Sequence, residues 1–125
     1  MLSNIKIILV DENIPFRQAL KAILVKEFNA SIIGELESIN DLQQIQNYSV
    51  ADIILLDLVL PEINGIKQTI NVLKQDSAIK IIALTSYNES IYHNNLLESG
   101  FVGCIYKDEL FNQLSSELKK ITRKN

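Results

Sequence analysis

Five short runs of apolar residues alternate along the chain with longer segments in which apolar residues recur every three or four positions. The runs cover residues 5–10, 30–34, 53–60, 79–84 and 101–106. Short runs rich in β-branched residues are typical of strands buried in a parallel sheet, and the longer repeats are typical of amphipathic helices. Five strands alternating with five helices through short connections predict an α/β fold, a doubly wound parallel sheet that forms a single domain over residues 1–125.

The predicted helices differ in how much apolar surface they can bury. Pro15 fits the first turn of the first helix, and Ser38 is a favoured cap for a short second helix. The fourth helix, from about residue 88 to 99, has a thin apolar face, mainly Ile91 with Leu96 or Leu97, and we expect it to be the least firmly held. The positions expected to face the sheet in the other four helices are Ile14, Leu20, Ile23, Leu24 and Phe28, then Ile39, Leu42 and Ile45, then Ile66, Ile70 and Leu73, and finally Leu110, Leu114, Leu118 and Ile121.

Composition narrows the class of protein. The apolar runs are too short to span a bilayer, and the N-terminus has no signal-peptide pattern, so we expect a cytoplasmic protein that does not enter membranes. One cysteine, Cys104, excludes an internal disulfide and a cysteine-built metal site. The net charge of −3 argues against direct nucleic-acid binding by bulk electrostatics.

Polar side chains stand where four of the predicted strands end. Asp11 and Glu12 follow the first run, Asp57 lies within the third, Thr85 follows the fourth and Lys107 ends the fifth. Each alone has an ordinary explanation as a cap, a turn residue or a solvated charge. The carboxyl ends of parallel strands meet at one edge of the sheet, however, and ligands of open α/β sheets bind there. A single composite site therefore explains the four positions better than four unrelated roles.

The donor types at this edge indicate phosphoryl chemistry. Oxygen ligands without a nearby histidine or cysteine favour Mg²⁺, which binds one or two carboxylates and a phosphate oxygen. A carboxylate beside the metal can attack phosphorus and form a mixed anhydride, and Asp57 is the candidate nucleophile. Lys107 can pair with the phosphoryl oxygens, and the Thr85 hydroxyl can donate a hydrogen bond to them.

Four motifs at these strand ends resemble the CheY-like receiver domain of bacterial two-component response regulators. They are VDEN at 10–13, LDLVLPEING at 56–65, ALTS at 83–86 and GCIYKD at 103–108. Their order and spacing match over essentially the whole chain, and the Lys107-Asp108 ending is most similar to receivers of LuxR-type transcription regulators.

The resemblance implies a flavodoxin-like (βα)5 fold with strand order 2-1-3-4-5. It implies that Asp57 accepts a phosphoryl group from a sensor histidine kinase or phosphotransfer protein. Mg²⁺ is then expected at Asp11 or Glu12, Asp57 and the Val59 carbonyl, and Thr85 and Lys107 are expected to sense the phosphate. Such a protein is a signalling module that assists its own phosphorylation and dephosphorylation, not a conventional enzyme. Its output is expected to be transcription regulation, with homodimer formation as a possible step.

Two positions depart from the family pattern. Glu12 stands where the family often has Asp, and the additional methylene can shift the metal. Cys104 stands three residues before the lysine, where the family usually has the aromatic residue that reports phosphorylation. Alternation along a strand puts Tyr106 on the same face as Cys104, so we expect Tyr106, or Tyr87 near Thr85, to take over signalling.

Three further interpretations concern residues and functions outside this scheme. His93, the only histidine, is expected to be a surface residue on the fourth helix. An unphosphorylated receiver-like module that binds its partner constitutively is the main alternative function, because the usual aromatic switch is missing. A small metal-dependent phosphatase is disfavoured, because Val59 stands where an Asp-x-Asp pattern requires a second acid.

Overall fold

The computed structural model describes residues 4–58, 63–86 and 90–122, with the side chains of 63–65 and 122 left out. It forms a five-stranded parallel sheet in the order β2-β1-β3-β4-β5, which confirms the predicted topology. The strands are β1 (Ile5–Val10), β2 (Ala30–Leu36), β3 (Ile53–Leu58), β4 (Ile81–Thr85) and β5 (Gly103–Tyr106). The α-helices are α1 (Ile14–Phe28), α2 (Ile63–Gln75), α3 (Ser90–Glu98) and α4 (Leu110–Thr122), and the 3₁₀ turns are η1 (Ile39–Gln44), η2 (Tyr48–Val50) and η3 (Lys107–Glu109).

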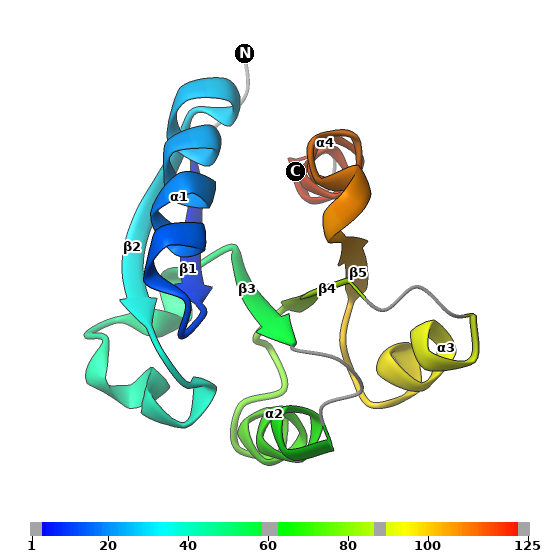
Figure 1. Ribbon diagram of the computed structural model, residues 1–125. Coiled ribbons are helices and arrows are strands. Elements are labelled where there is room, and N and C mark those ends of the chain that lie inside the picture. Colours follow the sequence, from blue (N-terminus) through cyan, green and yellow to red (C-terminus); the bar gives the residue numbers. More distant parts are fainter. Residues whose placement is uncertain (1–3, 59–62, 87–89, 123–125) are drawn as a thin grey trace.

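Helices cover both faces of the sheet (Figure 1). One core lies between the sheet and α1 with α4, and a second lies between the sheet and η1, α2 and α3. Successive strand residues alternate between the two cores, as Leu55 and Leu56 do in β3. Both faces of β3 and β4 are therefore buried, which explains why these strands appear in the sequence as continuous apolar runs. Within the described residues, none of the helices combines the length and the apolar character that crossing a membrane requires.

The first helix is held at both ends by asparagine. The Asn13 side chain accepts a hydrogen bond from the Phe16 backbone N–H at 3.0 Å, and Pro15 occupies the first turn as expected. Asn29 ends the helix in the left-handed conformation, with φ 55°. The start of α1 is thereby fixed directly after Asp11, so that Phe16 and Arg17 lie beside the C-terminal edge of the sheet.

The second predicted helix is a 3₁₀ turn. Ser38 caps η1 as expected, accepting from the Asn40 N–H at 3.2 Å, and Ile39 and Leu42 are buried. The apolar residues Ile39, Leu42 and Ile45 are three positions apart, and three residues make one turn of a 3₁₀ helix. The spacing therefore suits the tighter helix better than the α-helix.

Some of the core positions predicted in the helices are wrong. In α3 the buried residues are Tyr92 and Leu96, while Ile91 is 75% exposed and Leu97 is also exposed. Tyr92 and Leu96 are four residues apart and share a face, whereas Ile91 lies on the outside of the helix. Ile14 is exposed because it is the first residue of α1. The apolar face predicted for the last helix is confirmed, since its four residues all pack on the sheet.

Candidate functional site

Asp57 and Asp11 lie at the same edge of the sheet. Asp57 is the penultimate residue of β3, and its side chain is only 5% exposed. Asp11 follows β1, the strand next to β3, and is 6% exposed. Parallel strands bring their carboxyl ends together, so two acids separated by 46 positions in the sequence come side by side.

Lys107 closes the site from the end of β5. Its Nζ atom donates to Asp57 Oδ2 at 2.8 Å, and its side chain is 27% exposed. The same Nζ atom lies 4.4 Å from the centre of the Phe16 ring, a cation–π distance. Lys107 is thus held between a carboxylate and an aromatic face, with its charge directed at Asp57.

The environment of Asp11 raises the pKa of its carboxyl group to about 6. Burial is the main cause, because it penalises the charged form, and the close approach and negative charge of the neighbouring Asp57 carboxylate add to it. The Asn13 backbone N–H, which donates to Asp11 Oδ1 at 2.8 Å, and the charge of Lys107 act in the opposite direction. The site therefore concentrates more negative charge than the described side chains neutralise.

Two carboxylate oxygens in the site fit a divalent cation. Asp11 Oδ2 and Asp57 Oδ1 are buried, and neither has a hydrogen-bond partner among the described residues. Buried polar atoms are rarely left unpaired, and a cation bound to both would remove the penalty. Two carboxylates with additional water are a sufficient protein ligand set for Mg²⁺.

The other predicted metal ligands are placed differently. The Glu12 side chain is exposed, and the described part of the chain contains no group of three Asp, Glu, His or Cys side chains arranged to hold a metal. The Val59 carbonyl lies outside the described residues, and so does Tyr87. Asp11 and Asp57 are therefore the two acids that the structure brings together.

Thr85 ends β4 and is completely buried. Its backbone pairs in register with Leu58 on one side and Tyr106 on the other. Because Asp57 pairs with Leu84, Thr85 lies one residue further toward the carboxyl edge than the candidate nucleophile. It links the β3 end of the site to β5.

Tyr106 makes a contact that the sequence interpretation did not include. Its hydroxyl lies 2.8 Å from Nδ1 of His93 in α3, and the two rings are 6.0 Å apart between centres. His93 is half-buried, so its assignment as a plain surface residue is wrong. Tyr106 packs on the same core as Cys104, as strand alternation predicted. Burial raises the pKa of Tyr106 and, more strongly, that of the Cys104 thiol, to about 11.

Sequence reasoning also missed Phe16 and Arg17 in the first turn of α1. Phe16 contacts Lys107, and the Arg17 guanidinium donates to the backbone carbonyl of Asp11 at 2.6 Å. The available signal was position, because a helix that starts three residues after an acid at a strand end must pass beside the site.

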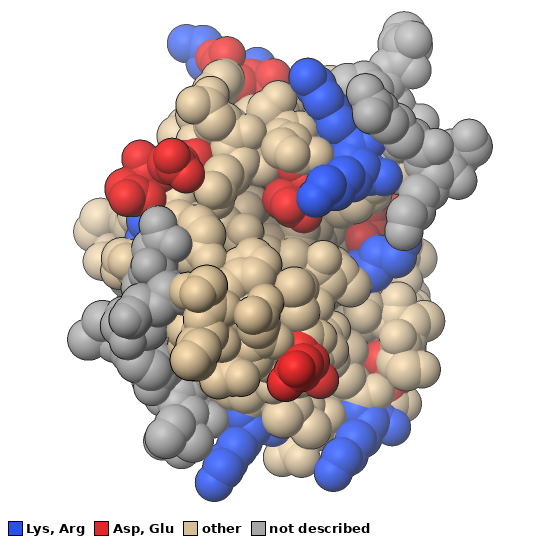
Figure 2. Space-filling view, turned by 90° about the vertical axis from the view of Figure 1, so that its right-hand side faces the viewer, with Lys and Arg blue, Asp and Glu red and all other residues tan. Residues whose placement is uncertain are grey.

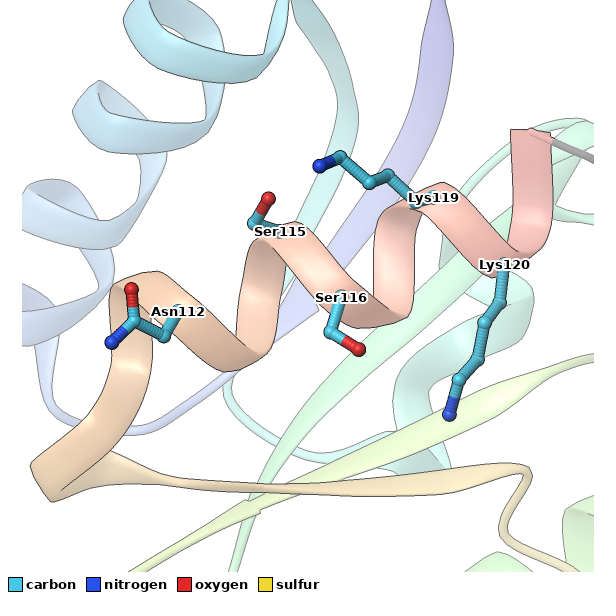
Figure 3. A pocket seen from close by; sticks show the side chains of 5 residues that line it. All are labelled: Asn112, Ser115, Ser116, Lys119 and Lys120. Carbon is cyan, nitrogen blue, oxygen red and sulfur yellow. The ribbon is translucent and has the colours of Figure 1, made fainter.

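Hollows elsewhere on the surface have a different character. One of about 400 Å³ runs along α4 (Figure 3) and is lined by Asn112, Ser115, Ser116, Lys119 and Lys120. These side chains all come from one helix, and the two lysines extend in opposite directions. The hollow contains no acid, so it offers none of the chemistry found around Asp57.

Comparisons with known proteins agree with this geometry. The family model of the response regulator receiver domain matches residues 7–119. The transcriptional regulatory protein YdfI of Bacillus subtilis is 33% identical over 103 residues, which are 82% of this chain and 48% of that protein. The chain spans about half the length of the curated relatives that it matches.

Solved structures show the same fold. A LuxR-family two-component response regulator from Aurantimonas sp. SI85-9A1 superposes with a TM-score of 0.83 at 22% identity, covering 98% of this chain and 88% of that one. CheY in the CheX–CheY–BeF3–Mg²⁺ complex of Borrelia burgdorferi gives 0.79 at 18% identity, with 94% and 88% covered. With 113 of its 125 residues matched by the family model, the chain belongs to the response regulator receiver domain family.

Proposed function

We propose that Asp57 accepts a phosphoryl group from a histidine kinase or phosphotransfer protein of a two-component system in the cytoplasm. The observation that carries the proposal is the pairing of Lys107 with one oxygen of Asp57 while the other oxygen, Oδ1, has no partner among the described residues. Lys107 orients the carboxylate, and one of its two oxygens would act as the nucleophile while the other binds the metal. Receiver-domain membership and the CheX–CheY complex, solved with BeF3 and Mg²⁺, support this direction.

The transfer requires positioning and charge neutralisation. Asp57 forms a new bond to phosphorus as the bond between phosphorus and the donor imidazole nitrogen breaks, and that nitrogen keeps the electron pair. Asp11 and Asp57 would hold Mg²⁺, which supplies charge neutralisation for the phosphoryl oxygens when bound. Glu12, being exposed, would reach the metal through water, and the Val59 carbonyl stays a predicted ligand. Lys107 and Thr85 would bind the phosphoryl oxygens of the product.

Phosphorylation would be relayed to the surface through β5. When Lys107 turns from Asp57 toward the phosphoryl group, the neighbouring Tyr106 is the residue that connects β5 to α3. We assign Tyr106 the switch role that the missing aromatic residue at Cys104 leaves vacant, with Tyr87 as the second predicted participant. Thr85 is the third, because it pairs in register with Tyr106.

The output surface would lie on the side of the molecule that carries α3 and α4. Figure 2 shows this side, where a broad uncharged area has charged side chains mainly around its margin. Ile91, Leu97 and Val102, on α3 and in its connection to β5, are exposed apolar residues. A partner domain or a second copy of the chain could bury them. Regulation of transcription, the activity named for YdfI, is the proposed output through a partner or a further domain.

One observation favours a second function, a receiver-like module that binds its partner without phosphate. Cys104 occupies the usual switch position and is buried, so nothing at that position can rotate as an aromatic side chain does. The His93–Tyr106 contact would then be a permanent structural link.

Intact mass after incubation with Mg²⁺ and acetyl phosphate separates the two functions. We expect one added phosphoryl group on the wild-type chain, and none on Asp57→Asn or when Mg²⁺ is omitted. Asp52→Asn is the matched control, because Asp52 is also an acid next to β3 but lies at its opposite end. An unmodified wild-type chain under these conditions would favour the phosphate-independent module.

A further inference from the structure

Arg17 connects the candidate metal site to the neighbouring strand β2. Its Nη1 atom donates to the Asp11 carbonyl oxygen at 2.6 Å, and its Nε atom donates to Glu35 Oε1 at 3.0 Å. The side chain is only 12% exposed. The planar guanidinium therefore spans the backbone that carries a candidate metal ligand and a carboxylate of the adjacent strand.

Glu35 is a firm anchor for this arginine. Lys21 binds its other carboxylate oxygen at 2.9 Å, and the Gln18 amide donates to Oε1 at 2.7 Å. These partners hold the pKa of Glu35 below its usual value, chiefly through Lys21. Glu35 thus stays ionised and oriented, and Arg17 cannot move away from Asp11 without losing a charge-assisted hydrogen bond.

The backbone of Asp11 is held on both sides. Its N–H donates to the Leu36 carbonyl of β2 at 2.9 Å, and its own carbonyl accepts from Arg17. The Asp11 carboxylate faces the like charge of Asp57, and this repulsion would displace the Asp11 backbone if it were not restrained. Because both backbone groups of Asp11 are engaged, its carboxylate stays next to Asp57 before any cation arrives.

We propose that Arg17, anchored by Glu35, is a positioning residue that prepares Asp11 for Mg²⁺ binding. The inference rests on the proposed function, in which Asp11 and Asp57 hold the metal. Arg17 touches neither the metal nor the phosphoryl group in this scheme, and it acts through the Asp11 peptide. Removing a residue that orients a metal ligand in this way typically lowers the metal affinity about 10- to 100-fold.

Mg²⁺ titration of the unphosphorylated protein, followed by backbone amide NMR shifts, tests the proposal. We expect Arg17→Ala to weaken Mg²⁺ binding at least about tenfold, and Arg17→Lys to give an intermediate loss because its single ammonium cannot span both acceptors. Lys26→Ala is the matched control, since Lys26 is an exposed cation in the last turn of the same helix, away from Asp11. It should bind Mg²⁺ as the wild type does.

A second readout separates positioning from general stability. Phosphorylation of Arg17→Ala by acetyl phosphate should need more Mg²⁺ for half-maximal rate but approach the wild-type rate at saturating Mg²⁺. Arg17→Ala with wild-type Mg²⁺ affinity, or an equal loss in Lys26→Ala, would overturn the positioning role while leaving the phosphoacceptor function intact. A wild-type chain that fails to bind Mg²⁺ at all would overturn both.

Discussion

The Nδ1 atom of His93 and the hydroxyl of Tyr106 lie 2.8 Å apart and join α3 to β5. This hydrogen bond connects the helix with the thinnest apolar face to the strand that ends in Lys107. If Tyr106 is a switch residue, the bond is a contact that phosphorylation has to break or strengthen.

A double-mutant cycle measures this link. We expect His93→Ala and Tyr106→Phe each to lower the free energy of unfolding, and the pair to show a coupling of about 1 kcal/mol, the usual net value of one hydrogen bond. Urea unfolding of the four proteins gives the coupling. Additive effects would mean that the contact does not connect the two elements energetically.

The second prediction concerns the aromatic support of Lys107. Phe16→Leu keeps an apolar side chain but removes the ring beneath the Lys107 ammonium. Loss of a partly exposed cation–π contact of about 0.5–1 kcal/mol should slow phosphorylation of Asp57 roughly two- to fivefold. Intact-mass time courses with acetyl phosphate provide the rate. Phe28→Leu changes an aromatic residue of the same helix away from the site and should leave the rate unaltered.

The third prediction is a pH dependence of stability without metal. Because the folded state raises the pKa of Asp11 from 3.8 to about 6, the folded protein binds a proton more tightly than the unfolded chain between these values. The contribution of Asp11 to stability should therefore decrease as the pH rises from about 4 to 6 and stay low above that.

Asp11→Asn isolates this contribution. At pH 7 the variant should be more stable than the wild type by on the order of 1–3 kcal/mol in the absence of Mg²⁺, and the difference should vanish near pH 4. Denaturant unfolding at several pH values gives the comparison. A variant less stable than the wild type at pH 7 would contradict the charge crowding between Asp11 and Asp57.

The fourth prediction concerns the end of α3. Gly100 has a φ of 110°, and a Cβ atom there would lie 2.7 Å from the Leu73 side chain. Gly100→Ala should therefore cost on the order of 1–3 kcal/mol, because it adds backbone strain and a clash with α2. Ser99→Ala, which removes one exposed hydrogen bond to Asn95, should cost under about 1 kcal/mol. Thermal unfolding of the two variants measures both losses of stability. Equal losses would mean that the backbone conformation of Gly100 is unimportant.

The sequence predicted the sheet well because the strands are buried on both faces, so their apolar runs carry little ambiguity. It predicted the helix faces less well where few apolar residues were available. In α3 we expected Ile91 to face the sheet, but Tyr92, whose ring buries more surface, takes that place and Ile91 is exposed. The 3₁₀ turn over Ile39 and Leu42 could be predicted only by interpreting the three-residue spacing of the apolar residues as a 3₁₀ helix and not as an α-helix.

For the candidate site, strand ends predicted which side chains meet but not how they are held. Asp57, Asp11 and Lys107 come together because the chain reaches one edge of a parallel sheet three times. The contacts of Arg17 and His93 depend on the rotation of a helix about its axis and on side-chain direction, which single-residue patterns do not define.

Cys104 gives the protein a built-in reporter of motion. It is the only cysteine, it is buried between β5 and the core under α3, and burial raises the pKa of its thiol to about 11. Alkylating reagents react with exposed thiolate, so the closed protein should label slowly, and each opening of this core should expose the sulfur. The rate at which a maleimide reacts with the unmutated chain would then time how often α3 separates from β5, with and without a phosphoryl group on Asp57.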